Sequence, residues 1–141
     1  MSGNYTFTII KPCAVKSGYT GAILSDIQKC GFQISALKFL QMTQDQAEAF
    51  YSVHKGLPFY EKLIQFMISG PVAVAILQRE NAVCEYRKLI GATNPEDAAE
   101  GTLRKKYAKN GRENAVHGSD SNENAAIESN FFFSQCERYE Y

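Results

Sequence analysis

The segment from Val72 to Leu77 is apolar at every position and constrains the fold of this chain more than any other stretch. Gly70-Pro71 comes immediately before it and interrupts regular structure on that side. The run is far shorter than the ~20 apolar residues that cross a bilayer. Its unbroken apolar character is typical of a central strand buried on both faces, although periodicity alone also allows a buried helical segment. We therefore expect a sheet built around Val72–Leu77.

Strand and helix patterns alternate before this run. The alternation from Tyr5 to Ile10 predicts a first strand. Residues 18–30 carry apolar side chains on one helical face, and Gly31 predicts the end of that helix. Residues 32–40 predict a second strand, with a bulge near Leu37 where the alternation slips.

Helix signals occupy the next segment and return after the central run. Thr43 and Gln46 have the spacing of a capping box, which predicts the start of a short helix. Residues 60–68 place apolar side chains at i, i+3, i+4, i+7 and i+8, the clearest amphipathic pattern in the chain. Asn81 is expected to cap a further helix that ends at Gly91.

The C-terminal part begins with a long segment of little periodicity, residues 92–113. About twenty residues without a strong element are unusual in a compact domain unless the loop has a function. Val116 ends a short predicted strand, and Asp120 and Glu123 have the spacing of a reciprocal helix cap, which predicts a helix over about 122–129. The phenylalanines at 131–133 are expected to form a final buried strand or to plug the core.

The predicted order is strand, helix, strand, helices, strand, helix, loop, strand, helix. This order fits an α+β or α/β plan with a small sheet and helices packed on one face, and in particular a split β-α-β–β-α-β unit. A chain of 141 residues can bury a real core and has the size of one domain. We therefore expect residues 1–141 to form a single domain.

Charge and cysteine content restrict the possible functions. The formal net charge is zero, so bulk attraction to nucleic acid or to an anionic membrane is not indicated. The basic residues from Arg104 to Arg112 leave nucleic-acid binding as a third hypothesis, which this charge balance disfavours. The four cysteines have no zinc-site spacing and are expected to be reduced thiols of a cytoplasmic protein, three of them buried. Residues 1–5 show no signal-peptide pattern, and no run could span a membrane.

Residues 114–121, Asn-Ala-Val-His-Gly-Ser-Asp-Ser, hold His117, one of two histidines. Imidazole can serve as a nucleophile or a proton shuttle near neutral pH, and Gly118 allows a sharp turn or the close approach of a ligand. A histidine at a strand end beside a helix N-terminus lies where backbone N–H groups favour anions. The same residues also fit a structural or solvated histidine. The chain contains no P-loop, dinucleotide fingerprint, nucleophile elbow or metalloenzyme signature.

This octapeptide resembles the active-site signature of nucleoside diphosphate kinases. The resemblance extends over about residues 6–133. Further matching segments occur in that family's order, namely Ile10-Lys11-Pro12, Pro58-Phe59, Ser69-Gly70-Pro71-Val72, Gly91 to Pro95, and Gly101 to Arg104. The resemblance implies a ferredoxin-like α+β sandwich, with a four-stranded antiparallel sheet, helices packed on it and a long loop before the active-site strand.

The resemblance also implies a ping-pong phosphotransferase. His117 would take the γ-phosphate of a nucleoside triphosphate and pass it to a nucleoside diphosphate. Glu128 matches a carboxylate that would hold the second ring nitrogen, and Ser119 matches a hydroxyl near that pair. Tyr51 would lie near the transferred phosphoryl group. The residues implied to bind the phosphates are Lys11, Arg87, Thr93 and Arg104.

The nucleoside would be held by two further residues in this resemblance. Asn114 would hydrogen-bond the sugar, and Phe59 would stack on the base, a contact that tolerates any base because every base has a π-face. Mg²⁺ is the implied cofactor, held mainly by phosphate oxygens and water, so no dedicated metal site is expected in the chain. A closed homo-oligomer, a tetramer or a hexamer, is also implied.

Some positions depart from the pattern of the family, namely Cys13, Leu57, Gly111 and Lys105-Lys106. These departures concern loop packing, affinity for the base and subunit contacts, and none removes a matched catalytic residue. The alternative hypothesis is a nucleotide-binding regulatory or interaction protein with little catalysis. Such a protein would bind nucleotide without phosphorylating His117, and the combination of His117 with Lys11, Arg104 and Asn114 disfavours it.

Overall fold

The computed structural model describes residues 3–141 and is built around one antiparallel sheet. Its strands lie in the spatial order β2-β3-β1-β4. They are β1 (Tyr5–Ile10), β2 (Gln33–Leu40), β3 (Val72–Gln78) and β4 (Val116–Gly118). This order is that of a split β-α-β–β-α-β unit, and it confirms the predicted ferredoxin-like α+β fold with a four-stranded sheet.

Helices connect these strands. The α-helices are α1 (Pro12–Lys16), α2 (Thr20–Lys29), α3 (Gln44–Phe50), α4 (Tyr60–Met67), α5 (Ala82–Ile90), α6 (Leu103–Tyr107) and α7 (Asn122–Phe132). Short 3-10 turns, η1 (Ser52–His54) and η2 (Gln135–Glu137), follow α3 and α7. The capping box of Thr43 and Gln46 is present at the start of α3, as predicted. Within residues 3–141, no helix is long and apolar enough to cross a membrane.

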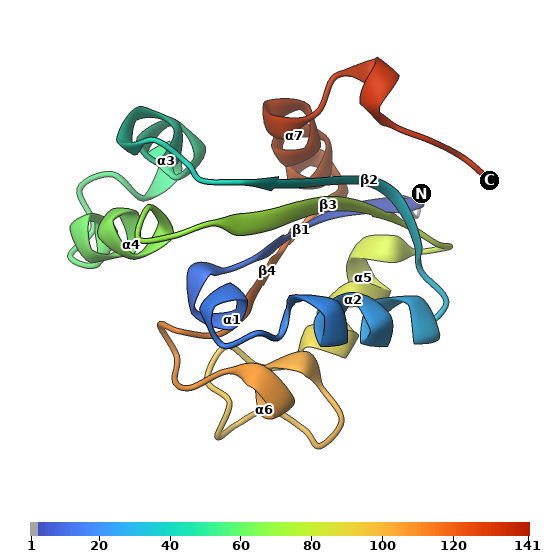
Figure 1. Ribbon diagram of the computed structural model, residues 1–141, viewed down its shortest axis with the longest axis horizontal. Helices are drawn as coiled ribbons and strands as arrows, with labels where there is room; N and C mark the ends of the chain where they lie inside the picture. Colours follow the sequence, from blue (N-terminus) through green and yellow to red (C-terminus); the bar gives the residue numbers. More distant parts are fainter. Residues whose placement is uncertain (1–2) are drawn as a thin grey trace.

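The helices cover both faces of the sheet, so the expectation of a single covered face is wrong. Neighbouring strand residues point to opposite faces, and two separate cores result. Ile10, Ala75 and Leu77 pack with α2 and α5, whereas Ile9, Val74 and Ile76 pack with α3, α4 and the end of α7. Figure 1 shows the sheet edge-on between these two groups of helices. The buried run of β3 separates the two cores, which explains why Val72–Leu77 is apolar throughout.

Two predictions about strands are corrected. The register shift of β2 lies between Ile34 and Ala36 rather than near Leu37. The C-terminal segment meets this irregular edge, because the Tyr139 N–H donates to the Ser35 carbonyl (2.8 Å). The final strand expected at 131–133 is absent, since α7 continues through residue 132, but the alternative of a core plug holds for Phe133, which is buried in the core with Phe132 packed against it.

The helix caps also differ from the prediction in two places. Ser121, not Asp120, caps α7, with its Oγ accepting from the Asn124 N–H (3.0 Å). Asn81 makes no side-chain cap at α5; it has a left-handed backbone with φ of 56°, and the Ala82 N–H donates instead to the Gly3 carbonyl (2.9 Å). The residue next to the predicted cap satisfies the backbone donor at α7, and a carbonyl from the distant N-terminal segment does so at α5.

The expected burial of three cysteines is wrong as well, whereas the expectation of free thiols agrees with the structure. All four thiols are free, Cys13 is half-buried, and the others, Cys30, Cys84 and Cys136, are exposed. Cys30 follows the last residue of α2, and Cys84 lies on α5 beside the buried Val83. Position in or next to an element therefore did not decide burial, because Cys84 lies on the solvent side of α5 and Cys30 lies just beyond the end of α2.

The long segment 92–113 contains one short element, α6, which the sequence did not predict. The Thr102 hydroxyl caps it by accepting from the Lys105 N–H (3.3 Å). Lys106 and Tyr107 both reach Asp26 of α2, at 3.1 and 2.7 Å. These contacts attach the segment to α2, and they leave Arg104 on the buried side of α6.

Candidate active site

His117 lies in β4, at the edge of the sheet beside β1. It pairs with Ile9, so its side chain lies on the face covered by α7. Gly118 follows on the opposite face, where an added Cβ would lie 2.9 Å from Cδ1 of Ile90 and 3.2 Å from the ring of Tyr86. Gly118 therefore allows α5 to pack closely against the strand that carries His117. The sharp turn expected at Gly118 is absent, because Gly118 lies within β4.

A carboxylate of α7 fixes the imidazole. Oε1 of Glu128 lies 2.8 Å from Nε2 of His117 and accepts a hydrogen bond from the Ser119 hydroxyl at 2.7 Å. The Ser119 backbone N–H donates to the Phe7 carbonyl (3.3 Å), which holds this residue against β1. The structure thus brings together three predicted site residues that are separated by up to eleven positions in the chain.

This contact determines which ring nitrogen is available for chemistry. A carboxylate oxygen can only accept a hydrogen bond, so Nε2 of His117 carries the proton that it donates to Glu128. In the neutral ring, the other nitrogen, Nδ1, then has its lone pair free. Within residues 3–141, no hydrogen bond is made to Nδ1. The arrangement presents Nδ1 as a nucleophile.

Aromatic rings surround the histidine. Phe7 and Phe50 meet its ring edge-on, with centroids 6.2 and 5.8 Å away. Neither residue was predicted in the site, because an aromatic residue in an alternating or helical pattern is first of all a core residue. Tyr51 is buried with its hydroxyl unpaired among the described residues. Burial, together with the negative charge of Glu128, raises the pKa of Tyr51.

Lys11 and Asn114 form a buried pair beside β4, the strand that carries His117. Nζ of Lys11 donates to Oδ1 of Asn114 (2.8 Å), and the Lys11 N–H donates to the Ala115 carbonyl (2.8 Å). Burial, together with the positive charge of Arg104, lowers the pKa of Lys11 to about 8. Lys11 has no carboxylate partner among the described residues, so its charge is available to an anion.

Arg104 supports the backbone around the site. Its guanidinium donates to the carbonyls of Asn114 (3.3 Å), Gly91 (3.1 Å) and Val116 (2.9 Å). Burial lowers the pKa of Arg104, and the positive charge of Arg87 adds to this effect. Arg104 thus lies within electrostatic reach of both Lys11 and Arg87, which come from distant segments, and this local positive charge favours an anion.

Two of the predicted phosphate ligands lie on the surface. Arg87 is exposed in the last turn of α5. Thr93 is exposed two residues after Gly91, the carbonyl of which receives Nη1 of Arg104. The positive charge of Arg87 acts on Arg104 and lowers its pKa. The Thr93 side chain makes no hydrogen bond within residues 3–141.

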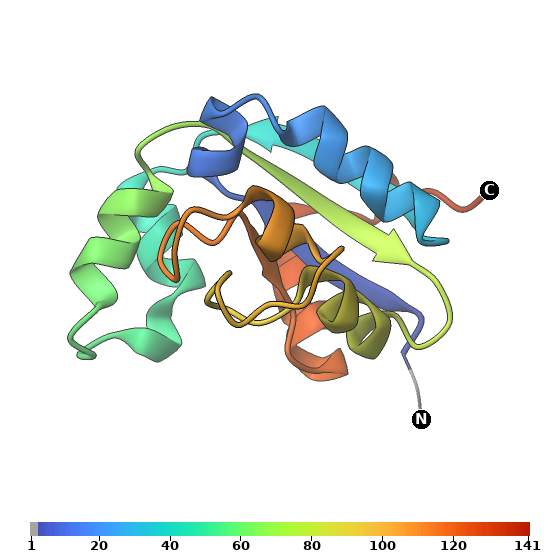
Figure 2. The ribbon, with the colours of Figure 1, turned by 90° about the horizontal axis from the view of Figure 1, so that it is seen from below.

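An open cleft adjoins the buried pair. It has a volume of about 350 Å³. The residues that line it are Lys11, Phe59, Leu63, Gly111, Arg112 and Asn114. Phe59 is 46% exposed, so part of its side chain is accessible to a ligand. Figure 2 shows the loop before β4 (orange) beside α4 (green), the two segments that form the walls of this cleft.

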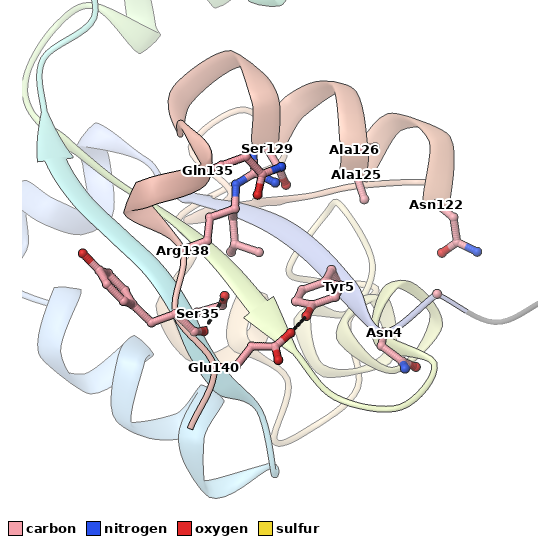
Figure 3. A pocket seen from close by; sticks show the side chains of 13 residues that line it. Asn4, Tyr5, Ser35, Asn122, Ala125, Ala126, Ser129, Gln135, Arg138 and Glu140 are labelled. Atoms are coloured by element: carbon pink, nitrogen blue, oxygen red, sulfur yellow. Dashed lines mark hydrogen bonds between the residues drawn. The ribbon is translucent and has the colours of Figure 1, made fainter.

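A different cavity lies away from these residues. It has a volume of about 530 Å³ and lies between α7, the start of β1 and the C-terminal segment, where Tyr5 donates to Glu140 (2.5 Å) (Figure 3). None of the predicted site residues lines it. Metal-ligand geometry is also missing: residues 3–141 contain no group of three or more His, Cys, Asp or Glu side chains that could hold an ion.

Comparison with known proteins places this geometry in a family. The family model for nucleoside diphosphate kinase matches residues 4–138. The chain belongs to the nucleoside diphosphate kinase family. It is 57% identical over 134 residues to the nucleoside diphosphate kinase of Lawsonia intracellularis. The matched residues cover 95% of this chain and 97% of that protein.

Solved structures of nucleoside diphosphate kinases have the same fold. That of Aquifex aeolicus matches with a TM-score of 0.94 at 40% identity, over 96% of this chain and 99% of that one. That of Halobacterium salinarum, in complex with CDP, matches with a TM-score of 0.93 at 31% identity, over 100% of this chain and 93% of that one. The family assignment therefore agrees with both sequence and fold.

Proposed function

We propose that this protein is a nucleoside diphosphate kinase that acts through a phosphohistidine at His117. The observation that carries the proposal is the 2.8 Å contact from Nε2 of His117 to Glu128, which leaves Nδ1 free. Nδ1 attacks the γ-phosphorus, a bond forms between nitrogen and phosphorus, and the bond from phosphorus to the β-phosphate oxygen breaks. The nucleoside diphosphate leaves, and the reverse sequence with a second nucleoside diphosphate regenerates His117.

Positive charge stabilises the transferred group in this mechanism. Phosphoryl transfer depends on positioning and electrostatics more than on covalent assistance. Lys11, Arg87 and Arg104 bind the phosphates, with the Thr93 hydroxyl as a further donor. The effect of the Arg104 charge on Lys11 and of the Arg87 charge on Arg104 supports this assignment. The buried Tyr51 hydroxyl, unpaired among the described residues, donates near the transferred phosphoryl group.

The nucleoside occupies the cleft beside these cations. Phe59 stacks on the base, and Asn114, already held by Lys11, hydrogen-bonds the sugar. Ser119 keeps Glu128 in place and so positions His117 without touching the nucleotide. The CDP complex of the Halobacterium salinarum relative supports a nucleotide ligand for this chain.

A divalent cation is consistent with the family, and we propose Mg²⁺. The described residues offer phosphate-binding cations but no carboxylate cluster, a donor set that fits an ion carried by the nucleotide's own phosphate oxygens and water. When bound, the ion neutralises phosphate charge. The protein residues bind and orient the nucleotide around it.

We also propose a homo-oligomer, a tetramer or a hexamer, for the single domain of residues 1–141. The edge strand β2 exposes Leu37 (49%) and Phe39 (62%). An exposed apolar edge strand is a surface that pairs readily with another chain. The cytoplasm is the proposed location, because four free thiols fit a reducing compartment.

Mixing the protein with ATP, Mg²⁺ and GDP tests the proposed activity. The expected product is GTP, and the His117→Ala variant is expected to form none. GTP formation at an equal rate by that variant would exclude the mechanism. Binding of ATP without transfer would instead support the alternative of a regulatory nucleotide-binding protein.

A further inference from the structure

The side chain of Arg112 is the feature of the cleft that the mechanism does not use. Lys11 and Asn114 bind each other at the inner end of the cleft, and Phe59 and Leu63 supply an apolar wall. Arg112 is the remaining lining residue with polar side-chain atoms. The cleft thus has one set of hydrogen-bond donors that neither the phosphates nor the sugar requires.

The loop that carries Arg112 is held in one conformation. Oδ1 of Asn110 accepts from the N–H groups of Arg112 (2.9 Å) and Glu113 (2.8 Å). The Lys109 N–H donates to the Glu113 carbonyl (3.0 Å), and Nδ2 of Asn114 donates to the Gly111 carbonyl (3.1 Å). The backbone at Arg112 is therefore positioned before a nucleotide binds, which lowers the entropic cost of using its side chain.

The guanidinium itself is free. A second hollow adjoins the cleft, and both Glu61 and Glu113 line it together with Arg112. Yet no ion pair or side-chain hydrogen bond of Arg112 occurs within residues 3–141. Gly111, beside it, has no side chain, and nothing lies within 4 Å of an added Cβ there. Space and free donors therefore lie together in the cleft that Phe59 also lines.

We propose that Arg112 selects guanine nucleotides by donating to the O6 and N7 acceptors of the base that stacks on Phe59. This inference rests on the proposed function, because it places the base in the same cleft. A guanidinium has the planar fork that matches this pair of acceptors. Adenine presents a donor where guanine has O6, and cytosine presents an amino group, so neither offers Arg112 the same pair.

Equilibrium titration of the unphosphorylated protein with diphosphates tests this inference without any phosphate transfer. The probes are GDP, IDP, ADP and CDP. GDP is expected to bind about tenfold more tightly than ADP or CDP, the difference made by one good bidentate contact. IDP is expected to match GDP, because inosine keeps O6 and N7 and lacks only the 2-amino group.

Three variants separate the possible causes of a preference. Arg112→Ala is expected to bring the ratio of GDP to ADP affinity close to one. Phe59→Ala is expected to weaken all four nucleotides together, since stacking does not depend on base identity. Lys62→Ala removes a cation that lines only the adjoining hollow, and it is expected to leave the ratio unchanged.

Several results would overturn the inference. The first is a wild-type ratio of GDP to ADP affinity near one, and the second is an Arg112→Ala variant that keeps the wild-type ratio. The third is equal weakening of all four nucleotides in that variant, which would indicate a contact to phosphate or to the face of the base. Failure of His117 to become phosphorylated would count against the proposed function alone. Absence of any nucleotide binding would count against both.

Discussion

Nε2 of His117 lies 2.8 Å from Oε1 of Glu128, and the same oxygen accepts the Ser119 hydroxyl at 2.7 Å. The two donors use one carboxylate oxygen, so the position of the imidazole depends on the charge and place of Glu128. This relationship sets the tautomer of His117, so a change at Glu128 is expected to change the reactivity of the ring.

The variant Glu128→Gln is expected to lower the rate of phosphate transfer by roughly 10–100-fold, as the loss of a residue that orients a reacting histidine typically does. The glutamine oxygen can still accept from His117 and Ser119, but it no longer stabilises a positive charge on the ring. Because Glu128 does not touch the nucleotide, KM should change little. Steady-state kinetics measures both parameters.

Ser119→Ala is the matched control for this prediction. It removes one of the two donors to Glu128 and leaves the charge in place, so the loss of rate should be smaller than in Glu128→Gln. A change in KM without a change in kcat in Glu128→Gln would contradict the assigned role.

The low pKa of Lys11 predicts a pH dependence of stability. Burial lowers its pKa from the ordinary 10.5 to about 8 in the folded protein. Between these values the unfolded chain binds more protons than the folded one, so the free energy of unfolding rises with pH in this window. Each unit of difference corresponds to about 1.4 kcal/mol, which gives a rise of up to about 3 kcal/mol for this group.

Urea unfolding from pH 7 to pH 10.5 measures this effect against Lys11→Met, a variant that cannot titrate at this position. Other groups titrate equally in both proteins. The wild type is therefore expected to gain stability relative to the variant above pH 8. Two curves that run parallel over the whole range would contradict the buried, unpaired state of Lys11.

Gly118→Ala is expected to destabilise the protein by about 1–3 kcal/mol, the usual cost of overpacking a filled core. The added Cβ would lie 2.9 Å from Ile90 and 3.2 Å from Tyr86, so β4 or α5 must move. A displaced β4 would also move His117 away from Glu128 and lower the rate. Urea unfolding and phosphate transfer measure the two effects.

Gly21→Ala provides a matched control on α2, since nothing lies within 4 Å of an added Cβ there. Alanine is a better helix former than glycine, so this variant is expected to gain roughly 0.5–1 kcal/mol. A Gly118→Ala variant as stable as the wild type would show that α5 does not pack against β4 as described.

Features that depend on neighbouring residues were predictable from the sequence. The boundaries of β1 and the capping box at Thr43 match their predictions, because alternation and cap spacing are local signals. The single apolar run of β3 correctly predicted a central strand. The split β-α-β–β-α-β plan was predictable from the order of elements, and the four-stranded antiparallel sheet from the resemblance to a known family.

Features that depend on distant contacts were not predictable in this way. Ser35 lies in the bulge of β2 where the C-terminal segment pairs with it, a contact over 104 residues. The packing of α5 on Gly118 is equally invisible in a local pattern. The contact of Phe50 with His117 depends on the fold that brings distant segments together. The same holds for the position of Arg112 in the cleft with Lys11 and Phe59.

The position of the phosphate on His117 tests the central claim most directly. After incubation with ATP labelled at the γ-phosphate, the isolated protein is expected to carry an acid-labile, base-stable phosphate on His117, bonded to Nδ1, and addition of GDP is expected to release it as GTP. NMR of the phosphorylated ring distinguishes its two nitrogens. Phosphate bonded to Nε2, or to another residue, would contradict the account in which Glu128 holds Nε2 and leaves Nδ1 to react.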